Sequence, residues 1–388
     1  MLDLRNKIIL IISPQNWGKM FISKHHYAIA LAKRGNEVYF LNPPDNHKWR
    51  IRGASKRIVI EKLNKYPGLN LIGHQLYFPY KIRFHAKGIY DFLMKKQVKD
   101  ILHAINKPVD IIWSFDLGNL YPLYLFGKKP FKIFHPVDEP GDKTAIRAAN
   151  GSDIIFSVTR EILEKYHHLP VPGHFINHGL AEYFLNPSDI NKPNGKNIQA
   201  GLSGNLLRQD LDRKSIVQII RENPAIIFNF YGTYEITDSN IGGSEDENTR
   251  SFIRSISSFP NVILHGVLPA FELANAAQII DIWLICYDIR KDQSRGTNYH
   301  KVMEYLSTGK VIVSNNITSY QGRNDLVRMI LSRENNEELP ALFKETIQRI
   351  KEFNAPDNQS IRVEYARQNT YDKQLDKIEK TLIETEEG

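Results

Sequence analysis

Apolar residues fall in short runs that alternate with segments of helical spacing, beginning at the N-terminus. Residues 7–12 form an apolar, β-branched run, residues 24–34 place apolar side chains at helical intervals, and residues 38–41 form a second run. Gly35 separates the helical segment from the second run. Continuous apolar runs linked through a helix are typical of parallel strands covered on both faces. The pattern predicts a βαβ unit that opens a parallel sheet.

The same alternation continues along the chain and restarts once. Further strands are predicted at 110–114, 132–135, 153–158 and 174–177. A polar, Pro/Gly-rich stretch at 186–197 reads as a linker, and strands follow at 198–203, 226–231, 262–265, 281–286 and 311–314. Residues 237–250 read as a surface loop and 371–385 as a last helix. We predict an α/β protein with two Rossmann-like domains facing across a cleft, at whose strand ends ligands bind.

Composition narrows the class of protein. The chain has 388 residues, enough for two cores, with 42% hydrophobic and 24% charged residues. Cys286 is the only cysteine, so no intrachain disulfide can form and a reducing compartment is expected. The apolar run at the N-terminus is too short for a signal peptide, and no apolar stretch approaches the ~20 residues of a spanning helix. We expect a cytoplasmic protein.

Positive charge is concentrated in the first half of the chain. Residues 1–190 hold 27 Lys/Arg against 16 Asp/Glu, whereas residues 191–388 hold 24 against 27. Nucleic acid, anionic lipid or an acidic substrate could each explain this excess.

The most informative segment runs from Gly296 to Val313 and reads as a loop, a helix start, a glycine cap and a buried strand. Amides of Thr297 and Asn298 at the helix start would suit a diphosphate. Lys301 and Glu304 are three residues apart and share a face of that helix. Lys301 could then pair with phosphate while Glu304 accepts hydrogen bonds from ribose hydroxyls. The alternative is an ordinary surface Lys–Glu pair.

Three predicted strand ends add candidates for the same ligand. Gly204 follows the strand at 198–203, and its missing side chain would let backbone approach a phosphate. Tyr231-Gly232 and Tyr287 end later strands and could line a base or sugar pocket, or else be core or rim aromatics.

These segments together resemble the GT-B glycosyltransferases, in particular the family 4-like bacterial enzymes. The segment from Gly296 to Val313 is similar to their nucleotide-sugar signature, which has a Lys-x-x-Glu-Tyr-Leu-x-x-Gly-Lys-x-Val core. The likeness covers most of the chain, and transferases of teichuronic acid and similar surface polysaccharides look closest. The other matching segments are His178–Phe184, Gly201–Leu206, Pro260–Gly266, Asp281–Ile285 and Asn369–Lys380.

The resemblance implies an acceptor domain over 1–190, a nucleotide-sugar domain over 198–370, and a closing helix, 371–388, that crosses back to the first domain. It implies a UDP-linked donor and a lipid-linked or polysaccharide acceptor. A cation from the turn after Gly204 pairs with the diphosphate in such enzymes. Arg208 is the candidate here, with Arg213 and Lys214 as alternatives, unless Arg208 simply starts the next helix. Gly296 stands where the family has the first glutamate of a pair, which puts the sugar contacts in doubt.

In the first domain, carboxylates follow the strand at 132–135. Asp138 is our candidate for removing the acceptor's proton or steadying a cationic sugar, with helix capping as the alternative. Trp17 and Lys24, after the first strand, are expected to contact a substrate or to be structural. Metal-dependent transferases usually have the other major glycosyltransferase fold, so we expect no metal, and no cofactor.

Two stretches mix cations with aromatic residues. One contains Trp49, Arg50 and Arg52, and the other contains Lys81 and Arg83. Such a mixture suits an anionic membrane surface, where rings insert and charges meet headgroups; solvated helix faces are the alternative. We expect no nucleic-acid partner, because no binding motif accompanies the charge.

Rival functions remain at this point. A UDP-sugar 2-epimerase has the same architecture, and a non-catalytic membrane-associated scaffold is consistent with Gly296. A dinucleotide-binding dehydrogenase is disfavoured, because Ser13–Gly18 lacks the Gly-x-Gly-x-x-Gly fingerprint.

Overall fold

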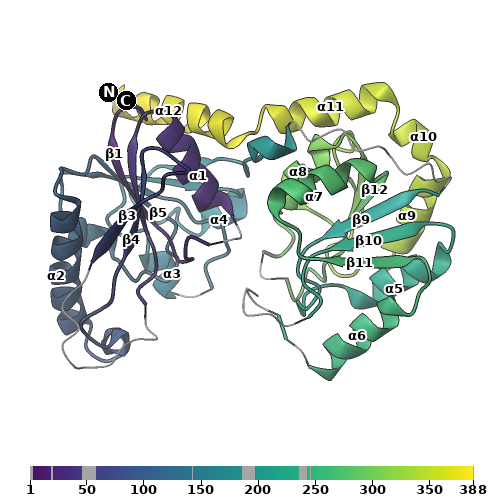
Figure 1. Ribbon diagram of the computed structural model, residues 1–388, viewed down its shortest axis with the longest axis horizontal. Helices are drawn as coiled ribbons and strands as arrows, with labels where there is room; N and C mark the ends of the chain where they lie inside the picture. Colours follow the sequence, from purple (N-terminus) through teal and green to yellow (C-terminus); the bar gives the residue numbers. More distant parts are fainter. Residues whose placement is uncertain are drawn as a thin grey trace. The chain divides into compact units, whose positions relative to one another are not determined.

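The computed structural model describes residues 3–18, 21–45, 58–141, 143–185, 197–235, 243–244, 246–292 and 294–387 (Figure 1). The chain divides into two compact units: residues 1–177 with 371–388, and residues 178–370. This division falls earlier than the predicted end of the first domain at 190. Leu180 bonds to the Asn369 carbonyl, and Phe184 lies in the second unit's core, so this segment packs with the second unit.

The first unit contains, among its described residues, an eight-stranded sheet in the order β3-β4-β2-β1-β5-β6-β7-β8. Every pairing is parallel except β3 with β4. The strands are β1 (Ile8–Ile12), β2 (Glu37–Leu41), β3 (Val59–Lys62), β4 (Leu69–Gly73), β5 (Ile111–Ser114), β6 (Phe131–Phe134), β7 (Ile154–Ser157) and β8 (Gly173–Phe175). Six of them confirm the predicted strands; β3 and β4 escaped prediction.

Both faces of this sheet are covered, as the apolar runs indicated. Ile9 and Ile11 of β1 pack with α1 (Ser23–Lys33) and α12 (Tyr371–Glu387), whereas Leu10 and Ile12 pack on the other face with α2 (Lys87–Ile105). The shorter helices of this unit are η2 (Tyr80–Phe84), η3 (Leu123–Phe126), α3 (Lys143–Arg147) and α4 (Arg160–Glu164).

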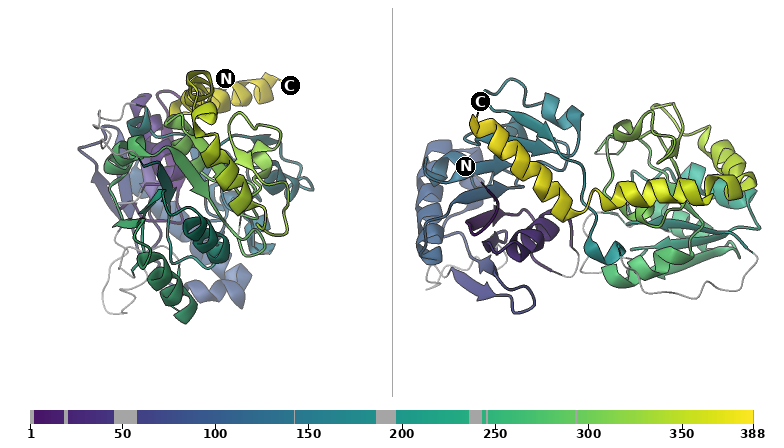
Figure 2. Two further views of the ribbon diagram at one scale, coloured as in Figure 1. Left: turned by 90° about the vertical axis from the view of Figure 1, so that its right-hand side faces the viewer. Right: turned by 90° about the horizontal axis from the view of Figure 1, so that it is seen from above.

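The last helix, α12, packs beside α1 (Figure 2). The guanidinium of Arg34, at the end of α1, lies 2.6 Å from carboxylate oxygens of both Asp372 and Asp376 and 3.7 Å from Glu379. Apolar residues of α12 also enter the core. The C-terminal helix therefore belongs to the first unit, and the predicted helix at 371–385 is confirmed.

The second unit contains a parallel sheet in the order β11-β10-β9-β12-β13-β14 within its described residues. Its strands are β9 (Gln199–Ser203), β10 (Ile227–Tyr231), β11 (Val262–Gly266), β12 (Ile282–Ile285), β13 (Val311–Ser314) and β14 (Arg328–Met329). The first five confirm the predicted strands. The helices are η4 (Glu182–Phe184), α5 (Arg213–Glu222), α6 (Glu247–Ser257), α7 (Ala270–Ala276), η5 (Ala277–Ile279), α8 (Lys301–Ser307), η6 (Thr318–Tyr320), α9 (Leu339–Gln348), α10 (Ile350–Phe353) and α11 (Pro356–Arg367).

Strand order reverses once in each sheet. In the first the reversal lies between β1 and β5, and in the second between β9 and β12. Loops that leave neighbouring strands in opposite directions open a crevice at such a point, where doubly wound folds bind ligands. The residues that follow these four strands are therefore the first place to seek a site.

Candidate functional site

Backbone packs very closely at the reversal in the second sheet. Gly204 follows β9 with φ +143°, and Gly232 follows β10 with φ +136°. A Cβ on Gly232 would stand 1.9 Å from the Gly204 carbonyl oxygen, and a Cβ on Gly204 would stand 2.8 Å from Lys301 Nζ. Only glycine fits such positions. The predicted turn is therefore present, and Lys301 reaches it.

Lys301 lies beneath the glycine turn rather than on the surface. Its side chain is buried, and Nζ donates hydrogen bonds of 2.6 Å to the Ser203 carbonyl and to the Tyr287 hydroxyl. Burial lowers the pKa of this ammonium. The reason is positional: Lys301 begins α8, and its long side chain spans from there to the end of β9. The sequence did not reveal this inward direction.

Glu304, one turn further along α8, is half-buried. Among the residues that the structure describes, its carboxylate has no hydrogen-bond or ion-pair partner. Burial raises its pKa to about 7, and the nearby Lys301 ammonium opposes the rise. An unengaged carboxylate in this position can accept hydrogen bonds from two hydroxyl groups of a ligand.

Arg208 brings a second cation to the same turn. Its Nε lies 2.8 Å from Asp210 Oδ1, its guanidinium carbon is 6.0 Å from the centre of the Tyr287 ring, and its Nη2 is 4.0 Å from Asp292 Oδ1. Hydrogen bonding to Asp210 raises its pKa. The Arg208 side chain is about two-fifths exposed. It is thus held in place while part of it remains accessible.

The loop before α8 closes around Asp292, which sequence reasoning missed. This buried carboxylate accepts hydrogen bonds from the Ser294 hydroxyl, the Gly296 amide and the Tyr299 hydroxyl, at 2.6–2.9 Å. Gly296 has φ +65°, and a Cβ there would stand 2.7 Å from the Asn316 carbonyl oxygen. A glutamate cannot occupy this turn as it stands, which explains the departure at Gly296.

The helix start predicted around Thr297 and Asn298 lies later in the structure. Both residues are buried in the turn that precedes α8, and α8 begins at Lys301. The Thr297 amide donates to the Ser294 carbonyl, so it is not available to an anion. The prediction of ligand-binding amides at Thr297 is therefore corrected.

Tyr231 borders the glycine turn from β10. Its ring stacks on His265 with centres 4.5 Å apart, and its carbonyl accepts the Gly204 amide. The hydroxyl is buried and has no hydrogen-bond partner in the described part of the chain, and burial raises its pKa to about 12. A buried hydroxyl without a partner is uncommon and is available to a ligand.

The reversal in the first sheet gathers a different set of polar groups. Asp138, exposed, follows β6, and Asp116, buried, follows β5. Lys24 is buried in the first turn of α1 and donates to Gln15. Burial lowers the Lys24 pKa to about 8, and the charges of Asp138 and Asp116 oppose that shift. A carboxylate two residues past the predicted strand at 110–114 was the signal that could have revealed Asp116.

Other first-unit candidates have different surroundings. Trp17 packs against Phe21, His25 and Phe40 with ring centres 5.0–5.3 Å apart, which makes it part of an aromatic cluster. Lys81 is exposed, and the Arg83 guanidinium lies over a neighbouring aromatic ring. Trp49, Arg50 and Arg52 lie outside the described residues.

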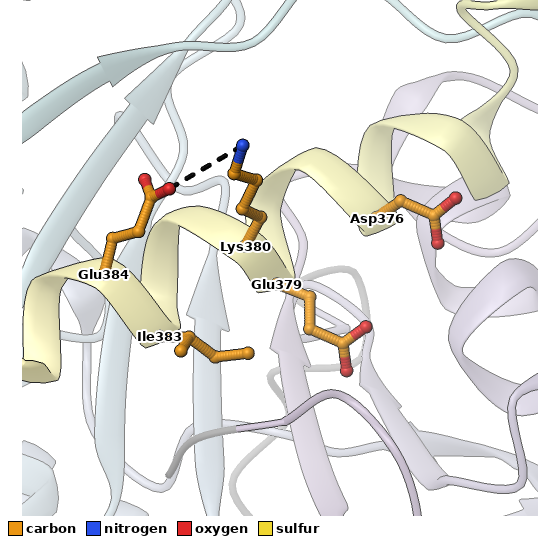
Figure 3. A pocket seen from close by; sticks show the side chains of 5 residues that line it. All are labelled: Asp376, Glu379, Lys380, Ile383 and Glu384. Carbon is orange, nitrogen blue, oxygen red and sulfur yellow. Dashed lines mark ion pairs between the residues drawn. The ribbon is translucent and has the colours of Figure 1, made fainter.

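A shallow hollow of about 370 Å³ on α12 does not suit a phosphate ligand (Figure 3). It is lined by Asp376, Glu379, Lys380, Ile383 and Glu384. Three of these five residues carry a carboxylate, and Lys380 Nζ lies 3.8 Å from a carboxylate oxygen of Glu384.

The described residues contain no cluster of three or more His, Cys, Asp or Glu side chains able to hold a metal. No described helix is long and apolar enough to span a membrane.

Comparison with known proteins identifies solved structures that have the same fold. No protein-family model matches the chain, and no curated protein is detectably similar in sequence. Solved structures do match. Sucrose-phosphate synthase from Thermosynechococcus elongatus has a TM-score of 0.71 at 10% identity, covering 98% of this chain and 99% of that one. A glycosyltransferase from Rickettsia africae has a TM-score of 0.67 at 13% identity, with 97% and 99% covered.

A third likeness is to a structure with bound ligands. HepE from Anabaena, solved with UDP and glucose, has a TM-score of 0.66 at 12% identity over 97% of this chain and 99% of that one. At such identities a likeness shows the fold alone. The chain therefore has the two-domain α/β fold of the GT-B glycosyltransferases, as its motifs implied.

Proposed function

We propose that this protein transfers a sugar from a UDP-linked donor to an acceptor hydroxyl. The observation that carries the proposal is the meeting of Lys301 and Arg208 at the Gly204 turn, at the reversal in strand order of the second sheet, with the unengaged Glu304 carboxylate one helical turn from Lys301. Solved structures of the same fold support it, since HepE was solved with UDP and with UDP-glucose.

Each group has a definite role in this proposal. Glu304 accepts hydrogen bonds from the ribose hydroxyls, and Tyr231 contributes its unpartnered hydroxyl. Arg208 and Lys301 supply the positive potential that stabilises the departing diphosphate, the electrostatic part of the catalysis. Because Lys301 is held by Ser203 and Tyr287, we propose that it also fixes the turn against which the phosphates lie.

The acceptor side rests on the first unit. We propose that Asp138 acts on the acceptor hydroxyl, as a general base or by stabilising the charge that develops on the sugar. The acceptor is proposed to be lipid-linked or a growing surface polysaccharide. The protein would then work in the cytoplasm, peripherally on the anionic inner face of the membrane.

Removing a ribose hydroxyl from the ligand tests the proposed role of Glu304 directly. We expect Glu304→Gln to weaken UDP binding about tenfold, because two hydrogen bonds to a charged carboxylate are replaced by at most one weaker bond to the amide oxygen. The wild type should prefer UDP over 2′-deoxy-UDP, and the variant should show a smaller preference. Thermal shift and calorimetric titration measure both affinities.

The matched control is Glu337→Gln, since Glu337 is exposed in the same unit. This variant should retain the wild-type preference for UDP. UDP release from a panel of UDP-sugars, with and without candidate acceptors, then tests transfer itself. Equal binding of UDP by the Glu304 and Glu337 variants would refute the site assignment.

A further inference from the structure

Exposed apolar side chains of the first unit gather on η2, the start of α2 and η3. Phe84, Ile89 and Phe92 are 62%, 58% and 71% exposed, and Tyr80 and Tyr124 are also exposed. Large apolar side chains gathered in this way on a folded surface commonly mark an interaction site. A partner for this surface would have to bury these apolar side chains.

Cations surround these rings. The Arg83 guanidinium lies 5.2 Å from the centre of the Tyr80 ring and 5.0 Å from that of Phe84, and Lys87 Nζ lies 5.4 Å from that of Tyr124. Residues 80–103 hold six Lys/Arg and two Asp. One of these acids, Asp91, is already paired with Lys87. The surface is therefore both apolar and strongly positive.

The geometry of α2 keeps the two kinds of side chain on one face. Ile89, Phe92, Lys95 and Lys99 recur every three or four residues and are exposed, whereas the opposite positions pack into the core. In a helix, residues at this spacing lie on one side. The apolar part is at the start of α2, next to η2, and the lysines follow along the helix.

The second unit provides a contrast. Ile263, Val267 and Phe271 are 45%, 55% and 51% exposed there, but no Lys or Arg occurs between residues 255 and 289. Exposed apolar side chains thus occur in both units, and the group at Ile263, Val267 and Phe271 lacks the cations that accompany the α2 surface. This pairing favours an anionic partner with an apolar interior.

We propose that η2 and the exposed face of α2 dock the protein on an anionic lipid bilayer. Phe84, Ile89 and Phe92 enter the boundary between headgroups and acyl chains, and Lys95 and Lys99 contact lipid phosphates. The inference rests on the membrane location in the proposed function and assigns it to a surface. Sequence reasoning had reached Lys81 and Arg83 but not Ile89 or Phe92.

Vesicle sedimentation with the full chain tests this surface. Phosphatidylcholine vesicles are compared with vesicles that also contain phosphatidylglycerol, at low and high salt. Phe84→Ser/Ile89→Ser/Phe92→Ser should weaken binding to anionic vesicles about tenfold or more, because apolar burial is lost. Lys95→Gln/Lys99→Gln should weaken it roughly fivefold for each cation removed.

Matched variants in the second unit serve as controls. Ile263→Ser/Val267→Ser/Phe271→Ser and Lys344→Gln/Lys351→Gln should bind vesicles as the wild type does. UDP thermal shifts, measured on every variant, report the fold and the nucleotide site separately. The docking surface would be overturned by equal binding to neutral and anionic vesicles, by no sedimentation, or by equal losses of binding in the control variants. None of these outcomes bears on the UDP result, which tests the proposed nucleotide site separately.

Discussion

The two sheets each reverse their strand order once, yet the polar groups at the two reversals are arranged differently. After β9, Gly204 allows backbone, Lys301 and Tyr287 to meet in hydrogen bonds of 2.6 Å. After β1, Ser13-Pro14 takes the place of the glycine turn, and Lys24 donates only to Gln15 among its described neighbours. Proline has no amide to donate. The comparison indicates that the reversal of the second unit holds a closely packed glycine turn with a bonded lysine, whereas that of the first unit holds a buried lysine with few hydrogen bonds and no glycine turn.

The largest effect should come from closing the space at the glycine turn. Gly232→Ala places a Cβ 1.9 Å from the Gly204 carbonyl oxygen at φ +136°, so we expect a loss of about 3 kcal/mol or more in the free energy of unfolding. UDP should no longer shift the melting temperature. Urea denaturation measures the stability.

Gly322→Ala is the matched control for that variant. Gly322 has φ +77° in the same unit, but nothing lies within 4 Å of its added Cβ. Backbone strain alone should cost about 1–2 kcal/mol and leave UDP binding intact. Equal losses in the two variants would show that the close contact is unimportant.

Two of the buried lysines, Lys301 and Lys24, should respond differently to the same substitution. Lys301→Met leaves the Ser203 carbonyl and the Tyr287 hydroxyl without their donor, and we expect a loss of about 2 kcal/mol. Lys24→Met removes a buried cation whose one acceptor among the described residues is Gln15, so stability should range from unchanged to a gain of about 2 kcal/mol. Urea denaturation at pH 7 compares them, and a larger loss for Lys24→Met would reverse the comparison.

A smaller effect, the pH dependence of the free energy of unfolding, tests Lys24 separately. Its pKa of about 8 in the folded protein is below the ordinary 10.5, so between those values the unfolded chain binds more protons. The free energy of unfolding should therefore rise with pH between 8 and 10.5, by as much as about 3 kcal/mol. The measured quantity is the stability of the wild type minus that of Lys24→Met, which removes the contribution of other groups. A difference that stays flat over this range would contradict the burial of Lys24.

Eleven of the fourteen strands in the described part of the chain followed from the sequence, because a parallel strand covered on both faces needs a continuous apolar run. β3 escaped because Val59–Lys62 is an edge strand with exposed residues, and β14 because two residues carry no pattern. The spacing of Lys301 and Glu304 placed both on one helix. The spacing did not show that the Lys301 side chain points inward, because that direction depends on Ser203 and Tyr287, which lie at or just after the ends of other strands of the sheet.

By itself, the sequence determined the alternation of strands and helices, the two sheets, the glycine turn after β9 and the helix that carries Lys301 and Glu304. These are local properties of periodicity and backbone freedom. Only the tertiary structure decided that Asp210 and Asp292 flank Arg208, that Gly296 closes on Asn316, and that Phe84, Ile89 and Phe92 share one exposed surface. Such contacts join residues from different elements, and their distances are set by how those elements pack.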